Sequence, residues 1–210
     1  MVDNPVVAQL CLEKALATIE AAVDELGKLD SFAGDGDHGL GMARGFRAAV
    51  AAKGDGTVGD VLAKAGTAFA DAAGGASGAL VGMWITTVGG SLKSQTIDAA
   101  QLHRALEAGL NAMTRLGKAK VGDKTMIDAL DPFVRAFGEA ASSGVSIIAA
   151  WKAALPAAEK GMQSTADMIS KKGRSSRLGE RSRGNLDPGA VSITYVLRAV
   201  GAALEEECVA

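Results

Sequence analysis

Glycine and helix-capping residues divide this chain into apolar helical segments, and that division constrains its fold more than any other sequence feature. Asn4 followed by Pro5 is typical of an N-cap and a first helical residue. Apolar residues then recur at helical spacing as far as Gly27. Similar segments, each opened by a capping residue or ended by a glycine, follow one another to the C-terminus. No strong alternating strand pattern lies between them, so the sequence predicts helices throughout.

Eight helices are predicted from these signals. The β-branched run between Val191 and Val196 is also assigned to a helix, because Pro188 opens its segment and apolar residues continue at helical spacing. Pro132 and Pro156 lie inside predicted helices, where proline occupies a first turn or kinks the helix. The predicted helices cover about residues 5–27, 40–52, 57–74, 77–92, 96 or 98 to 117, 126–141, 146–171 and 188–207.

The composition suits an all-α fold. Hydrophobic residues make up 48% of the chain and aromatic residues only 4%, so the core must consist mainly of aliphatic side chains and alanine. Such side chains favour closely packed helices. We therefore expect residues 1–210 to form a single domain, an eight-helix bundle or barrel. The polar segment from Lys171 to Asn185 is rich in glycine, serine and arginine, and we expect it to be the most mobile loop.

The charge and cysteine content disfavour several function classes. Lys and Arg total 22 against 24 Asp and Glu, and a formal net charge of -2 provides no general attraction for nucleic acid or an anionic membrane. Cys11 and Cys208 form no CxxC pair, which disfavours a zinc site and a disulfide framework. Neither a signal-peptide pattern nor a membrane-spanning apolar run is present in the sequence. We therefore expect a cytoplasmic protein with reduced thiols.

Three aspartates lie close together in one glycine-rich turn, DSFAGDGDHG. Asp30, Asp35 and Asp37 supply the hard oxygen ligands that Mg²⁺ prefers, usually together with waters and substrate phosphates. The segment does not match the EF-hand pattern of calcium sites. Two interpretations stay open: a magnesium-nucleotide site, or a solvated turn whose aspartates cap the next helix. His38 can order a metal-bound water, contact phosphate or form a structural hydrogen bond, and we do not assign it as a metal ligand.

A second motif, AGGASGA at residues 73–79, lies between two predicted helices. Its small residues allow backbone amides to approach an anion, and a helix N-terminus adds unpaired N–H groups and a positive dipole end. Ser77 can also donate its hydroxyl group. The motif lacks the spacing and the terminal lysine of a Walker A loop. An anion site and a tight turn with Ser77 as the N-cap are both consistent with it.

The third motif is the basic segment GRSSRLGERSRGNLDPGA at residues 173–190. At least one of its arginines could contact a nucleotide phosphate when the loop closes, and the alternative is a solvated basic loop. Asp187 and Pro188 form an N-cap and first-residue pair in either case. The four arginines are Arg174, Arg177, Arg181 and Arg183.

Taken in order along the chain, GDGDHG, GGASG, GDKTM and the basic segment resemble the motifs of the L subunit, or L domain, of dihydroxyacetone kinase. The resemblance covers almost the whole chain. It implies an eight-helix α-barrel with a nucleotide site in the loops at one end, in agreement with the helices predicted independently. The chain departs from the family pattern at Arg177, where an aromatic residue is common, and at Asn185, where histidine is common.

The resemblance also implies the residues of the site. Asp30, Asp35 and Asp37 would bind two magnesium ions joined to the phosphates of ATP or ADP. No residue of this chain is expected to act as a nucleophile or base, because phosphoryl transfer depends mainly on positioning and charge neutralisation. The nucleotide would contact or border His38, Gly39, Leu40, Gly41, Ala76, Ser77, Gly117, Met126, Arg174, Asp187, Pro188 and Gly189.

A partner completes the predicted active site. The resemblance implies a homodimeric phosphotransferase subunit of glycerol metabolism that phosphorylates dihydroxyacetone or a related short ketose held on a separate K subunit. The phosphate would come from free ATP, or from bound ADP recharged by a phosphotransferase-system phosphoprotein. Two alternatives stay open: the nucleotide domain of a fatty-acid kinase, whose substrate a lipid-binding partner presents, and a non-enzymatic adenine-nucleotide sensor that docks on a regulator.

Overall fold

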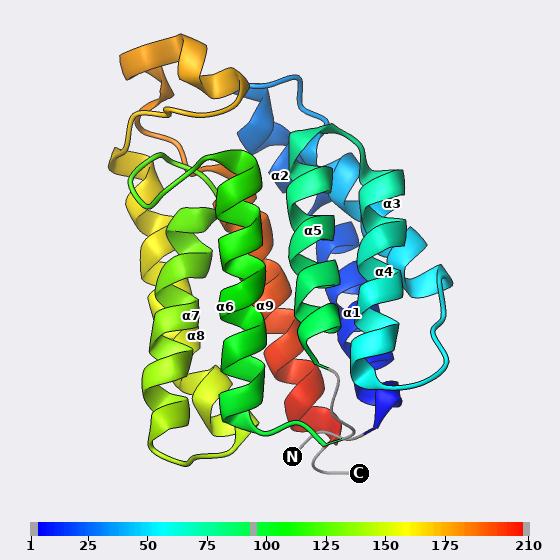
Figure 1. The fold of residues 1–210 in the computed structure, drawn as a ribbon. Helices are drawn as coiled ribbons and strands as arrows, with labels where there is room; N and C mark the ends of the chain where they lie inside the picture. The colour runs from blue at the N-terminus through cyan, green and yellow to red at the C-terminus, as the bar shows by residue number, and fades with distance from the viewer. Residues whose placement is uncertain (1–3, 93–95, 208–210) are drawn as a thin grey trace.

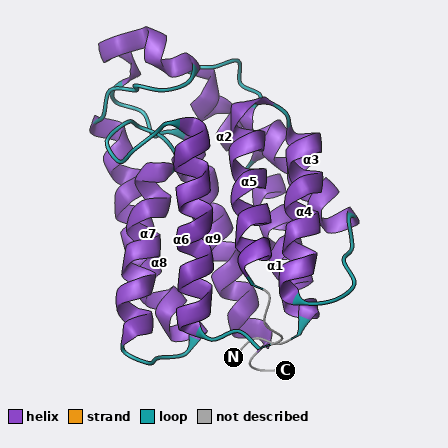
Figure 2. Cartoon of the chain, in the orientation of Figure 1, coloured by secondary structure: helices purple, strands orange, loops and turns teal. Residues whose placement is uncertain are grey.

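The computed structural model describes residues 4–92 and 96–207, and these residues are folded mainly into helices (Figure 1; Figure 2). They contain no β-strand, so the all-α prediction is confirmed. Two 3₁₀ helices, η1 (Thr165–Asp167) and η2 (Arg174–Ser182), accompany the α-helices. The α-helices are α1 (Pro5–Ala21), α2 (Val23–Ser31), α3 (His38–Ala51), α4 (Val58–Ala73), α5 (Gly75–Ser91), α6 (Ala99–Gly117), α7 (Ile127–Ser142), α8 (Ile147–Ser164) and α9 (Pro188–Glu207).

The helices run alternately up and down along one axis (Figure 1). Because α1 and α2 follow each other in the same direction, they form one span, and the described residues make the predicted eight spans. Helices adjacent in sequence pack together, and α1 closes the bundle against α9. The α2–α3, α4–α5, α6–α7 and α8–α9 connections therefore gather at one end of the bundle (Figure 1).

The first predicted helix, residues 5–27, has the wrong boundaries. It breaks at Ala22 and continues as α2 beyond Gly27 to Ser31. A Cβ at Gly27 would lie 3.1 Å from the Gly36 carbonyl oxygen. This glycine therefore allows the close approach of the aspartate loop and does not end a helix.

Other boundaries also differ from the prediction. α5 begins before Ser77, because Gly74 takes the N-cap position with a φ of 70°. Ser77 is thus inside the first turn and is not the N-cap. α8 ends at Ser164 instead of residue 171, and the segment predicted to be the most mobile loop contains η2. Pro132 and Pro156 lie inside α7 and α8, which continue through both residues.

Small residues allow α4 and α5 to pack closely. A Cβ at Gly66 would lie 2.4 Å from the Thr86 backbone nitrogen, and one at Gly82 would lie 2.5 Å from the Ala70 Cβ. Replacing either glycine would force the helix backbones apart. This close packing fixes the position of the glycine turn that joins the two helices.

The interior is mostly aliphatic, as predicted, with a few aromatic contacts. Phe133 and Phe137 pack edge-on against Trp151, whose indole nitrogen donates to the Leu197 carbonyl oxygen at 2.8 Å. An apolar cavity of about 120 Å³ lies within the bundle. Among the described residues, no helix is both long and apolar enough to cross a membrane.

Candidate functional site

A pocket of about 580 Å³, lined by both polar and apolar residues, lies at the end of the bundle where the four motif-bearing connections meet. A cavity of this size suits a small-molecule ligand. Its lining includes twelve of the fifteen residues predicted to bind metal or nucleotide. They are Asp30, Asp37, His38, Gly41, Ala76, Ser77, Gly117, Met126, Arg174, Asp187, Pro188 and Gly189.

Asp35, Gly39 and Leu40 lie outside the pocket lining. Residues three apart share a helix face, so His38 and Gly41 face the pocket while the two residues between them face elsewhere. Gly39 packs on α2, where a Cβ would lie 2.4 Å from the Val23 carbonyl oxygen. Leu40 is 54% exposed. Of the predicted segment His38–Gly41, only the first and last residues therefore line the pocket.

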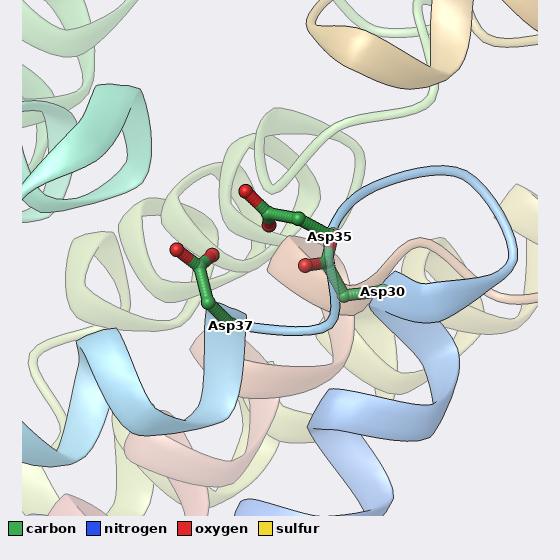
Figure 3. A group of neighbouring side chains, drawn as sticks. All are labelled: Asp30, Asp35 and Asp37. Carbon is green, nitrogen blue, oxygen red and sulfur yellow. The ribbon is translucent and has the colours of Figure 1, made fainter.

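The α2–α3 connection brings three carboxylates together (Figure 3). Oxygen atoms of Asp30, Asp35 and Asp37 all lie within 4.8 Å of one another. Asp30 is only 8% exposed, and its Oδ2 accepts hydrogen bonds from the Gly36 nitrogen at 3.0 Å and the His38 nitrogen at 3.4 Å. The other two aspartates are exposed. One carboxylate is thus fixed by the backbone, and two project toward solvent.

This arrangement favours cation binding over helix capping. Asp37 takes the N-cap position of α3, but within the described residues its side chain forms no capping hydrogen bond. Three convergent carboxylate oxygens fit a hard cation that completes its coordination with water or phosphate. The donor set therefore fits Mg²⁺.

The α8–α9 connection approaches the same aspartates from the other side. Arg174 in η2 donates from Nη1 to Asp35, and its Nη2 lies 3.4 Å from the Asp37 Oδ1. Partial desolvation raises the pKa of Asp35, but hydrogen bonding with Asp37 and the positive charge of Arg174 outweigh it, and the pKa lies below its usual value. The guanidinium group thus lies beside the carboxylates, where its positive charge would also attract the terminal phosphates of a metal-bound nucleotide.

His38 joins α3 to α9 at the pocket wall. Its Nε2 lies 2.9 Å from the Ser192 Oγ, and the ring is buried. Burial lowers the pKa of His38, an effect that the charges of Asp30 and Asp37 only partly offset. The structural hydrogen bond, one of its predicted roles, is therefore present.

The glycine turn presents a helix N-terminus to the pocket. Gly74 and Gly75 both have positive φ, and a Cβ at either would meet nothing within 4 Å. No side chain in residues 4–92 and 96–207 caps α5, so its first backbone N–H groups are available to an anion. The Arg44 side chain holds this turn against α3 by donating to the Ala73 carbonyl oxygen at 3.1 Å.

Asp187 begins α9 at the back of the pocket. Its Oδ2 accepts from the Ala190 nitrogen at 2.8 Å, and Pro188 is the first helical residue, so the predicted N-cap pair is confirmed. Burial raises the pKa of Asp187 to about 7, although the Ala190 hydrogen bond acts in the opposite direction.

Lys124 lies in the α6–α7 connection and is only 5% exposed. Its Nζ donates to the carbonyl oxygens of Ser182 at 2.6 Å, Asn185 at 2.7 Å and Met168 at 3.3 Å. Asp128 in the first turn of α7 accepts from the Thr125 nitrogen at 2.7 Å and so fastens this connection to the helix. This loop therefore supports the segment that carries Arg174.

Comparison with known proteins identifies the family of this site. The model of the DAK2 domain matches residues 32–202, which is most of the chain. The chain belongs to the DAK2 domain family. The relationship to dihydroxyacetone kinases that the ordered motifs predicted is thereby confirmed.

The relatives of this DAK2 domain include separate subunits and longer enzymes. The chain is 39% identical over 178 residues to the ADP-binding subunit of PEP-dependent dihydroxyacetone kinase 1 from Listeria innocua, covering 83% of this chain and 84% of that subunit. It is 38% identical over 202 residues to L-erythrulose kinase from Pectobacterium atrosepticum, covering 93% of this chain but 34% of that enzyme. It thus spans about a third of the length of the erythrulose kinases it matches.

A solved structure supports the same fold for this DAK2 domain. The crystal structure of dihydroxyacetone kinase from C. freundii in complex with AMP-PNP and Mg²⁺ matches with a TM-score of 0.69 and 27% identity. The match covers 96% of this chain and 34% of that chain.

Two contacts of the DAK2 domain site were not predicted from the sequence. Lys124 was assigned no role, although this residue lies in the GDKTM motif. The signal available for a role was its position in a glycine turn beside Asp123. The contact of Arg174 with Asp35 and Asp37 was also not predicted. It joins motifs separated by 139 and 137 residues, and no local pattern pairs them.

Proposed function

We propose that this DAK2 domain binds a magnesium-nucleotide complex and donates phosphate to dihydroxyacetone or a related short ketose held by a separate K-type subunit. The observation that carries this proposal is the meeting of three aspartates, the α5 N-terminus and Arg174 around one pocket. The names of the relatives support it, since they include an ADP-binding subunit of dihydroxyacetone kinase and several erythrulose kinases.

Each wall of the pocket has a defined part in the proposed reaction. Asp30, Asp35 and Asp37 would hold magnesium, and phosphate oxygens of the nucleotide would complete its coordination shell. When bound, magnesium supplies the charge neutralisation that phosphoryl transfer needs. The α5 N-terminus would bind phosphate oxygens, and Arg174 would add fixed positive charge on the opposite side.

The finer features of the proposal rest on the family. The family resemblance implies two magnesium ions. The ketose would be presented by a partner, because the separate-subunit relatives are named as subunits of a kinase. The PEP-dependent relatives favour bound ADP, recharged in place by a phosphotransferase-system phosphoprotein, over exchange of free ATP. We propose a cytoplasmic homodimer as the working form.

Reconstitution tests this function directly. The chain is first titrated with Mg-ADP by calorimetry and then mixed with K subunits loaded with dihydroxyacetone or erythrulose. Free ATP and phosphoprotein-driven recharge are compared as phosphate sources. We expect Mg-ADP binding and phosphorylation of a ketose.

The negative outcomes of this experiment are informative. An absence of Mg-ADP binding would refute the proposal at its base. Binding together with transfer only to an acyl-loaded partner would indicate a fatty-acid kinase. Binding without transfer to any acceptor would indicate a nucleotide sensor.

A further inference from the structure

Lys124 joins the α6–α7 loop to both ends of the basic lid, defined as residues 170–185. Its three ammonium hydrogens match three carbonyl acceptors: Met168 just before the lid, and Ser182 and Asn185 at the C-terminal end of the lid. Two of these bonds, at 2.6 Å and 2.7 Å, are short. A single buried cation thus brings the two ends of the lid together.

The neck of the lid is closed by further bonds around this lysine. The Ser170 nitrogen donates to the Ser182 Oγ at 2.9 Å, and the Gly184 nitrogen donates to the Ala166 carbonyl oxygen at 2.8 Å. The Lys171 nitrogen donates to the carbonyl oxygen of Asp123, the residue before Lys124, at 3.0 Å. The base of the lid is therefore attached to the α6–α7 loop.

The far part of the lid reaches across the pocket through Arg174. This side chain is 56% exposed and contacts Asp35 and Asp37. It follows Gly173, whose φ is 64°, and a Cβ there would meet nothing within 4 Å. Because such a glycine restrains the chain weakly, the place of Arg174 depends on how firmly the neck is held.

The geometry points to Lys124 as a positioning residue that holds the basic lid so that Arg174 meets the phosphate side of the pocket. The local backbone is consistent with a specific role, since Lys124 adopts a left-handed φ of 61° that non-glycine residues rarely take. Burying an ammonium group is costly unless its hydrogens are bonded, and here three carbonyl groups satisfy them. The inference rests on the proposed function, because it assigns Lys124 to the same nucleotide site.

The test compares Lys124→Met with Lys120→Met, an exposed lysine in the same loop. We expect Lys124→Met to weaken Mg-ADP binding about tenfold and to speed tryptic cleavage of the basic lid about tenfold, as expected for the loss of bonds to a charged group. Lys120→Met should change neither quantity. Both are measured at a temperature at which circular dichroism shows the variants folded.

A double variant separates positioning from general destabilisation. If Lys124 acts by placing Arg174, adding Lys124→Met to Arg174→Met should cause little further loss of Mg-ADP affinity. Fully additive losses, or unchanged lid cleavage in folded Lys124→Met, would overturn the inference. Should Lys124→Met fail to fold, Lys124→Gln and Ser182→Ala, which loosen the same neck, are tested by the same criteria.

The cleavage assay needs no nucleotide and therefore separates the two hypotheses. If the wild-type chain binds no Mg-ADP, the proposed function fails, and faster lid cleavage in Lys124→Met would then show only that the lysine holds the neck. If the wild-type chain binds Mg-ADP and Lys124→Met binds it equally well, only the positioning role is refuted.

Discussion

The aspartate loop and the basic lid face each other across one pocket, but they are held in place differently. Asp30 orients its loop through backbone nitrogens six and eight residues further along the chain. The lid is held by Lys124, which lies 58 and 61 residues from two of its carbonyl partners. The aspartate loop is therefore organised locally, and the basic lid depends on the tertiary fold.

This difference predicts how each wall responds to substitution. Changes in the aspartate loop should remove ligands without disturbing the helices. Changes at the neck of the lid should act at a distance, through the position of Arg174.

Asp35→Asn or Asp37→Asn should weaken Mg-ADP binding about a hundredfold and remove most phosphate transfer, because each variant loses a charged ligand of the proposed magnesium site. Calorimetry measures the affinity, and circular dichroism should show unchanged helices. The matched control is Asp55→Asn, an exposed aspartate in the α3–α4 turn at the opposite end of the bundle. Unchanged affinity in both site variants would return these aspartates to a turn-forming role.

Arg174→Met should weaken Mg-ADP binding about tenfold, because the lid then loses the proposed charge-assisted contact with phosphate. The effect should be smaller than that of the aspartate variants, since the metal ligands remain. Arg177→Met, an exposed change in the same lid, is the control. Equal losses in both arginine variants would mean that the lid acts only through its net charge, and the specific role of Arg174 would be rejected.

Asp35 in the aspartate loop and Asp187 at the back of the pocket should titrate differently. Asp35 has a lowered pKa, whereas burial raises the pKa of Asp187 to about 7 from 3.8. The folded state therefore binds a proton at Asp187 more tightly than the unfolded state, and its contribution to stability falls as pH rises from about 4 through about 7. Asp187→Asn keeps an N-cap but cannot ionise.

Chemical denaturation between pH 5 and pH 8 measures this effect. The wild-type chain should lose about 1 kcal/mol of stability relative to Asp187→Asn across this interval. Solvent screening keeps this loss small, because the Asp187 residue as a whole is only partly buried. Parallel pH profiles for the two proteins would contradict the assignment.

The fold was largely predictable because its signals are local. Caps such as Asn4, Thr57 and Asp98 mark helix starts that the structure confirms within a residue or two. The break at Ala22 was missed because alanine is a good helix former, so the break has no signature in the residue itself. Gly74 replaced Ser77 as an N-cap because its positive φ turns the chain earlier.

The site was predictable on the aspartate side and less so on the lid side. Asp30, Asp35 and Asp37 share one short motif, and the structure brings their carboxylate oxygens together. Lys124 bonds to main-chain carbonyl groups, which every residue possesses, so its partners leave no mark in the sequence. The segment that forms η2 was expected to be a mobile loop because it is rich in Gly, Ser and Arg. Its composition gives no sign of the main-chain bonds that hold its neck.

The closing of the bundle by α1 and α9 has a practical consequence for protein engineering. Pro5 and Glu207 bound these helices at the end away from the pocket, and the Asn4 side-chain amide lies 3.3 Å from the Glu207 carboxylate (Figure 1). A reporter domain fused at either position would leave the pocket open. A circular permutant could join these neighbouring positions with a short linker and open the chain in the α3–α4 turn.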